Sequence, residues 1–131
     1  MGLDVHAKGM PPYSISYIRY GTFRAELVRK VYGDECYNIF MIPPFIWNET
    51  PHEEIQTYIG YWNSVCNEDL DLFLLHSDCD GKFTPQECKR ILKALKPIEL
   101  DLPDRDMSNM LDNWKAMFRH CAKRRVNMYF G

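Results

Sequence analysis

Seven large apolar residues recur at helical spacing of three and four near the end of the chain, over about four turns. They are Met107, Met110, Leu111, Trp114, Met117, Phe118 and Cys121. This spacing places them on one face of a helix, and that face must pack against other elements. With 131 residues, 46% of them hydrophobic, the chain can bury a core of its own. We expect one domain, residues 1–131, that folds without metal or disulfides.

Both ends of the chain have the composition of β-strands. Residues 3–7 alternate apolar and polar side chains, and the Pro11–Pro12 pair follows. Residues 126–130 are strand-like as well. Pairing of the two segments predicts a small antiparallel sheet. The expected fold class is therefore α+β, a mainly helical domain of about four helices with a sheet formed by the terminal strands.

The first helix is expected to begin at Thr22, whose hydroxyl can cap a helix, and to end near Tyr32. Three cations lie on or beside its polar side, Arg24, Arg29 and Lys30. They predict a basic, solvated helix face.

Two elements are expected between residues 36 and 67. Residues 36–42 are aromatic and β-branched and predict a strand. Thr50 and Glu53 have the spacing of a capping box, which predicts a helix over 51–67. Its apolar residues share one face and predict a buried stripe: Ile55, Tyr58, Ile59 and Trp62. In the alternative interpretation, Trp62 and Tyr61 form the aromatic wall of a ligand site.

The segment 76–87, HSDCDGKFTPQE, has the spacing of a twelve-residue EF-hand calcium loop. Gly81 falls at the sixth position, where a sharp turn requires a residue without a Cβ. The spacing predicts an EF-hand-like helix-loop-helix over about 68–96. The candidate metal ligands are His76, Asp78, Asp80, the backbone carbonyl of Lys82, Thr84 and Glu87.

Thr84 and Glu87 also form a second capping box, with Pro85 at the first helical position. This predicts a helix that begins where the exit helix of an EF-hand begins, so two independent patterns agree on the register. Pro97 is expected to end that helix.

The first position of the loop departs from the calcium pattern, because His76 replaces an aspartate. Calcium prefers oxygen ligands and is expected to bind weakly, whereas an imidazole beside three carboxylates suits zinc or manganese better. A loop without metal, held by hydrogen bonds alone, is an alternative. In a third interpretation the loop is catalytic, with His76 as general base and either Cys79 as nucleophile or a water activated by metal at Asp78 and Asp80.

Three segments resemble a group of small uncharacterised bacterial and phage proteins, whose members begin with MGLD and carry HSDCDG. The segments are the opening residues 1–5, residues 20–23 and the stretch LLHSDCDGKFTPQEC over residues 74–88. The resemblance implies a prokaryotic or viral cytosolic protein and supplies no activity.

Two classes of function stay open. The first is a small binding protein whose EF-hand-like loop orders a surface for a protein or small-molecule partner. The second is a metal-dependent hydrolase of a phosphorylated or nucleotide substrate. A net charge of −2 argues against nucleic acid as a partner, and no apolar run approaches the roughly 20 residues that span a membrane. Five cysteines without a CxxC pair, and a start without a signal peptide, predict a reducing cytoplasm. The single loop makes a homodimer an option.

Overall fold

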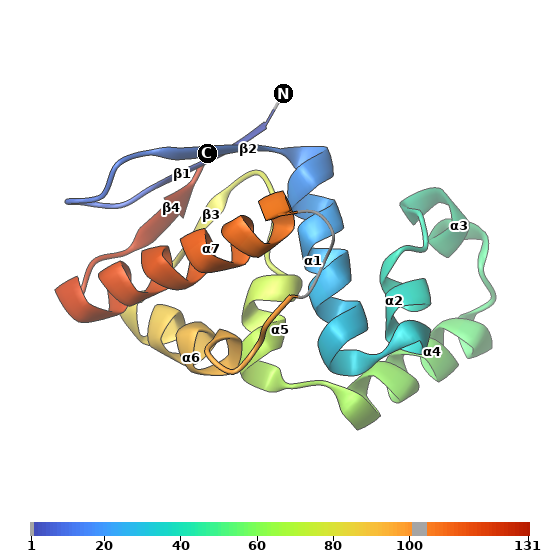
Figure 1. The fold of residues 1–131 in the computed structure, drawn as a ribbon. Helices are drawn as coiled ribbons and strands as arrows, with labels where there is room; N and C mark the ends of the chain where they lie inside the picture. The colour runs from blue at the N-terminus through green and yellow to red at the C-terminus, as the bar shows by residue number, and fades with distance from the viewer. Residues whose placement is uncertain (1, 101–104) are drawn as a thin grey trace.

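Helix α7 (Arg105–Arg124) confirms the periodicity near the end of the chain. All seven of the apolar residues that define its expected face are buried. The computed structural model describes residues 2–100 and 105–131, and within them the chain forms seven helices and four strands (Figure 1). The expected mainly helical α+β class is confirmed.

The sheet contains both ends of the chain. Strand β1 (Gly2–His6) pairs antiparallel with β4 (Met128–Phe130), with Val5 opposite Phe130. The composition did not indicate the other two strands. Strand β2 (Tyr13–Ser16) pairs with β1, and β3 (Gly81–Phe83), part of the predicted loop, pairs with β4. The strand order is β2-β1-β4-β3.

An aromatic cluster joins the sheet to the helices behind it. The ring of Phe73 lies 5.0 Å from that of Trp114 and 5.5 Å from that of Phe118, centroid to centroid. Phe83 of β3 and Phe130 of β4 add rings 5.4 Å apart. Such edge-to-face pairs stabilise a core beyond their buried area. The predicted loop 76–87 is therefore attached to the main core through β3.

Helix α1 (Tyr17–Tyr32) begins five residues earlier than expected. Its N-cap is Ser16, whose hydroxyl accepts a hydrogen bond from the Arg19 amide, and Thr22 lies inside the helix with its hydroxyl bonded to the Ile18 carbonyl. The expectation at Thr22 was wrong because Ser16 offers an equivalent hydroxyl earlier in the chain.

Residues 36–42 are not a strand. The chain forms helix α2 (Asp34–Phe40) there, because Gly33 ends α1 at a φ of 99° and acidic Asp34 and Glu35 occupy the first turn of the next helix. Aromatic and β-branched residues favour a strand only where a partner strand can pair with them. Here the tertiary context favours a helix instead.

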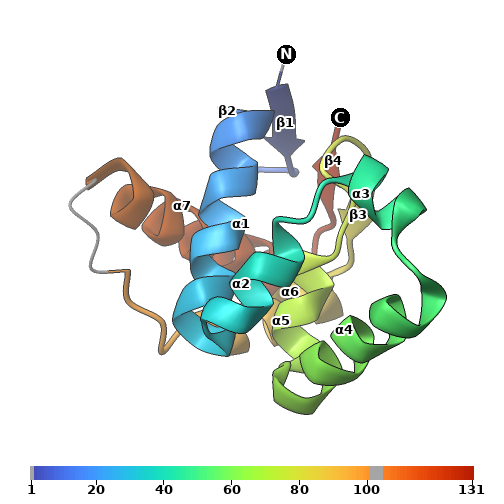
Figure 2. The ribbon, with the colours of Figure 1, turned by 90° about the vertical axis from the view of Figure 1, so that its right-hand side faces the viewer.

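Helix α3 (Pro44–Glu49) and helix α4 (His52–Val65) follow. The expected helix at 51–67 is confirmed, but the capping box at Thr50 is wrong. Pro51 is the N-cap, and the Thr50 hydroxyl donates instead to the Ile46 carbonyl at 2.6 Å. Helices α2–α4, residues 34–65, form what we call the α2–α4 lobe. Figures 1 and 2 show α3 and α4 beside α2, on the side away from the sheet and α7.

Helix α5 (Glu68–Leu74) is capped by the Asn67 side chain. Helix α6 (Pro85–Leu95) begins with the predicted capping box, and both of its reciprocal hydrogen bonds are present. The helix-loop-helix of the predicted segment is thus present as α5, β3 and α6.

Arg24 is buried, and this corrects the expectation of a solvated side chain at that residue, whereas Arg29 and Lys30 are exposed as expected. Its guanidinium donates to the carbonyls of Leu74 at 3.0 Å and His76 at 2.8 Å, and it lies over the Tyr20 ring at 4.4 Å. A cation at the C-terminal end of a helix is stabilised by the exposed carbonyls. Arg24 therefore caps the C-terminal end of α5 and holds the backbone at the start of the loop.

Replacing Arg24 with Met is expected to lower the free energy of unfolding by about 2–3 kcal/mol, because buried carbonyls lose charge-assisted hydrogen bonds. Urea denaturation measures the change. The control is Lys30→Met on the exposed side of the same helix, with an expected change within about 0.5 kcal/mol. Equal effects of the two substitutions would contradict the role given to Arg24.

Candidate functional site

The predicted turn of the loop lies at Gly81, where the backbone has a φ of 98°. A Cβ at this position would lie 3.1 Å from the His76 ring, so the turn requires glycine twice, for its backbone angle and for this close approach. The sequence placed this residue correctly.

His76 faces the core. Its ring lies 4.1 Å from the ring of Phe83 and 5.0 Å from that of Phe130, between centroids. Nδ1 lies 2.9 Å from the Ser77 carbonyl oxygen and Nε2 lies 3.2 Å from the Lys82 carbonyl oxygen. Each ring nitrogen thus lies within hydrogen-bond distance of a carbonyl oxygen of the turn, and a neutral imidazole, which carries one N–H, donates to one of the two.

The other candidate ligands are engaged separately or exposed. Asp80 accepts a hydrogen bond of 2.8 Å from the Ser77 hydroxyl, and Asp78 is exposed. Glu87 accepts from the Thr84 amide at 2.9 Å as part of the capping box. Across residues 2–100 and 105–131, no group of three or more His, Cys, Asp or Glu is placed to hold a metal ion. The loop in this arrangement does not bring the predicted ligands together, and metal binding stays a prediction.

The residues of the catalytic hypothesis, His76 and Cys79, have different hydrogen-bond partners. The sulfur of Cys79 lies 3.5 Å from the Ser77 hydroxyl, and its amide donates to the same hydroxyl. His76 is bonded to backbone carbonyls instead. No hydrogen bond is recorded between the thiol and the imidazole in the described part of the chain.

A second candidate site lies in the α2–α4 lobe. A hollow of about 340 Å³ opens between its helices and the end of α5, and its lining is mostly apolar. We call it the apolar groove. Its lining residues are Ile39, Phe40, Trp47, Tyr58, Ile59, Trp62, Asn63 and Leu75. Leu75 precedes His76 directly, so the groove and the loop are adjacent along the chain.

Trp62 attaches α4 to the rest of the protein. Its ring packs edge-on against Tyr32 at 5.1 Å and stacks on Phe40 at 6.2 Å, between centroids, and its indole nitrogen donates to Asp71 at 3.0 Å. The Tyr32 hydroxyl donates to the second oxygen of Asp71 at 2.6 Å. Burial, together with this bond to a carboxylate, raises the pKa of Tyr32. Trp62 is thus at once a buried anchor and one wall of the groove.

The buried stripe expected on α4 is only partly formed. Trp62 is buried, Ile55 and Tyr58 are half-buried, and Ile59 is 44% exposed. Helix α3 packs on α4 through Trp47 and Tyr58, whose rings lie 5.7 Å apart. No described element covers the remaining apolar side, and this is why the prediction of burial is wrong at Ile59.

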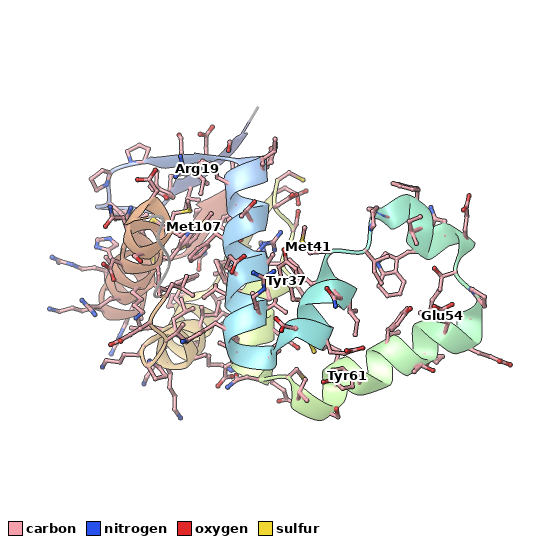
Figure 3. The ribbon with its side chains drawn as sticks, turned by 45° about the vertical axis from the view of Figure 1, so that its right-hand side comes forward. Arg19, Tyr37, Met41, Glu54, Tyr61 and Met107 are labelled. Atoms are coloured by element: carbon pink, nitrogen blue, oxygen red, sulfur yellow. The ribbon has the colours of Figure 1, made fainter. Side chains whose placement is uncertain are left out.

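The lobe and the loop lie in a strongly acidic part of the chain. Residues 31–81 contain ten Asp or Glu residues and no Lys or Arg. Glu54 lies beside the groove, as its carboxylate accepts a 2.6 Å hydrogen bond from the Tyr58 hydroxyl and raises the pKa of that phenol. Figure 3 shows the side chains between α3 and α4, with Glu54 near the start of α4. This absence of cations is visible in the sequence and is the signal that could have directed attention to the lobe.

Comparison with known protein families, with curated proteins and with solved structures finds no match to this chain. Among the described residues, no helix is both long enough and apolar enough to cross a membrane.

Calcium is expected to bind the loop more weakly than the roughly 10⁻⁷–10⁻⁵ M of calcium sensors, because the His76 side chain supplies no oxygen and its ring nitrogens face two backbone carbonyls. Titration calorimetry with calcium, manganese and zinc measures this. His76→Ala and Glu87→Ala serve as comparisons that separate a loop site from binding elsewhere. A micromolar or tighter calcium affinity that both substitutions abolish would contradict the expectation.

Proposed function

We propose that this protein is a binding protein and that the apolar groove of the α2–α4 lobe is its recognition surface. The observation that carries the proposal is the half-exposed apolar face of α4 beside a hollow lined by three aromatic-rich helices. Exposed apolar patches of this kind mark ligand or partner sites in proteins that otherwise bury such residues.

The packing of the lobe supports this proposal. Helix α3 has no buried residue, and α4 has one, Trp62. Phe45 is 65% exposed and Ile46 is 42% exposed, on a helix that contributes little to the main core. Apolar side chains that the fold leaves exposed stabilise a complex when a partner buries them.

The hydrolase hypothesis predicts a deep pocket beside His76 with converging cationic side chains. Arg24, the buried cation nearest the start of the loop, donates to the backbone carbonyls of Leu74 and His76. His76 is absent from the linings of four surface hollows formed by the described residues. The geometry therefore favours binding, and hydrolysis stays a prediction that depends on the metal titration.

The state of the cysteines supports a reducing compartment such as the cytoplasm of a prokaryotic or phage-infected cell. All five are free thiols. Cys88 and Cys121 are both buried and close enough for a hydrogen bond, in which the Cys88 thiol donates, so that the pKa of Cys88 is raised and that of Cys121 is lowered. Free thiols throughout a chain are typical of proteins in compartments that contain reducing thiols.

Nile red, a neutral dye that fluoresces in apolar sites, is expected to bind the native protein, because the groove offers an apolar hollow open to solvent. Ile59→Glu is expected to lower the dye affinity at least about tenfold by placing a charge on the groove wall. The control is Ile18→Glu, at an apolar residue that is 83% exposed on α1. Circular dichroism of both variants reports the fold.

Equal dye binding by the wild type and Ile59→Glu, with both folded, would refute the groove as the recognition surface. Loss of binding in Ile18→Glu but not in Ile59→Glu would refute it as well.

A further inference from the structure

We infer that the occupant of the apolar groove is an amphipathic helix of another protein whose polar face carries Lys or Arg. The inference rests on the proposed function and adds the chemistry of the partner. Three features of the molecule support it: the shape of the groove, the distribution of charge, and the scarcity of a matching surface elsewhere on this chain.

One wall of the groove runs along helix α4. Its wall on α4 is built from Tyr58, Ile59, Trp62 and Asn63, which lie on successive turns of one side. Helices α3 and α4 carry further exposed apolar residues that are not part of the lining of the hollow. They are Phe45, Ile46 and Tyr61. Helices that bind in such grooves place apolar anchors on successive turns and so cover a longer surface than a small molecule does.

The charge of the chain is divided between two regions. Residues 31–81 carry ten acidic and no basic residues, a net charge of −10. The remainder carries all sixteen Lys and Arg with the other eight acidic residues, a net charge of +8. Glu54 is bonded to a residue that lines the groove. Negative charge beside an apolar surface favours a partner with positive charge beside an apolar stripe and repels an acidic one.

A second copy of this chain does not offer such a helix. Its basic helices, α1, α6 and α7, bury their apolar faces in the core. Outside the lobe and the adjoining Leu75, the large apolar residues exposed in the described ranges are Ile18, Val31 and Tyr129. They lie on α1 and β4 and form no continuous stripe, so a partner of different sequence fits the groove better.

Titration calorimetry with synthetic peptides of about eighteen residues tests the inference. One peptide has Leu and Lys in amphipathic order, a second replaces every Lys with Glu, a third replaces every Lys with Gln, and a fourth has the Leu/Lys composition in scrambled order. The amphipathic Leu/Lys peptide is expected to bind at micromolar concentration. The Leu/Glu and scrambled peptides are expected to bind at least about thirtyfold more weakly, and the Leu/Gln peptide about tenfold.

Two variants locate the interaction on the protein. Glu54→Lys is expected to weaken Leu/Lys binding about threefold or more, whereas Asp112→Lys, the same charge change at an exposed site on α7, leaves it nearly unchanged. Ile59→Glu, which leaves the acidic residues in place, is expected to abolish it.

The outcomes distinguish failure of this inference from failure of the proposed binding function. Equal binding of the Leu/Lys and Leu/Gln peptides, or Nile red binding without Leu/Lys binding, overturns the basic helix and leaves the groove as a binding surface. If neither the dye nor any of the peptides binds, the inference and the proposed function are both overturned. Sedimentation that shows a dimer broken by Ile59→Glu overturns the inference in favour of a second copy.

Discussion

The carboxylate of Asp71 joins three helices, and the arrangement of the lobe depends on it. One oxygen accepts from the indole of Trp62 on α4 and the other from the hydroxyl of Tyr32 on α1, while Asp71 itself belongs to α5. Hydrogen bonds to a charged acceptor in a half-buried site are stronger than those between neutral groups. With Trp62 held in this way, α4 is fixed at one end, and the apolar side of its earlier turns is left open.

The molecule has two distinct parts, and Asp71 connects them. The sheet with α1, α5, α6 and α7 forms a core closed by aromatic contacts, in which the predicted loop is one structural turn held by Arg24 and His76. The α2–α4 lobe contributes few buried residues to that core and carries an apolar groove in an acidic setting. The proposed recognition surface thus lies in a different segment of the chain from the core that stabilises the fold.

Local chemistry made much of the fold predictable. The capping box at Thr84, the glycine turn at Gly81 and the periodicity of α7 depend on neighbouring residues, and each was found from sequence. Arg24 and Ile59 could not be placed correctly, because burial of an arginine and exposure of an isoleucine depend on elements distant in sequence. The same limit applies to the predicted metal ligands. Sequence spacing grouped His76 with Glu87, but in the structure the imidazole packs against Phe83 of the core.

Hydrogen exchange followed by mass spectrometry, with and without the amphipathic Leu/Lys peptide, tests the central claim most directly. If the groove is the recognition surface, amides over residues 44–65 exchange more slowly with peptide present, while those of α6 and α7 are unchanged. The open face of α4 predicts this pattern, because a docked helix covers those turns and restricts their opening. Protection confined to α6 and α7, or none in the lobe at saturating peptide, would contradict the account.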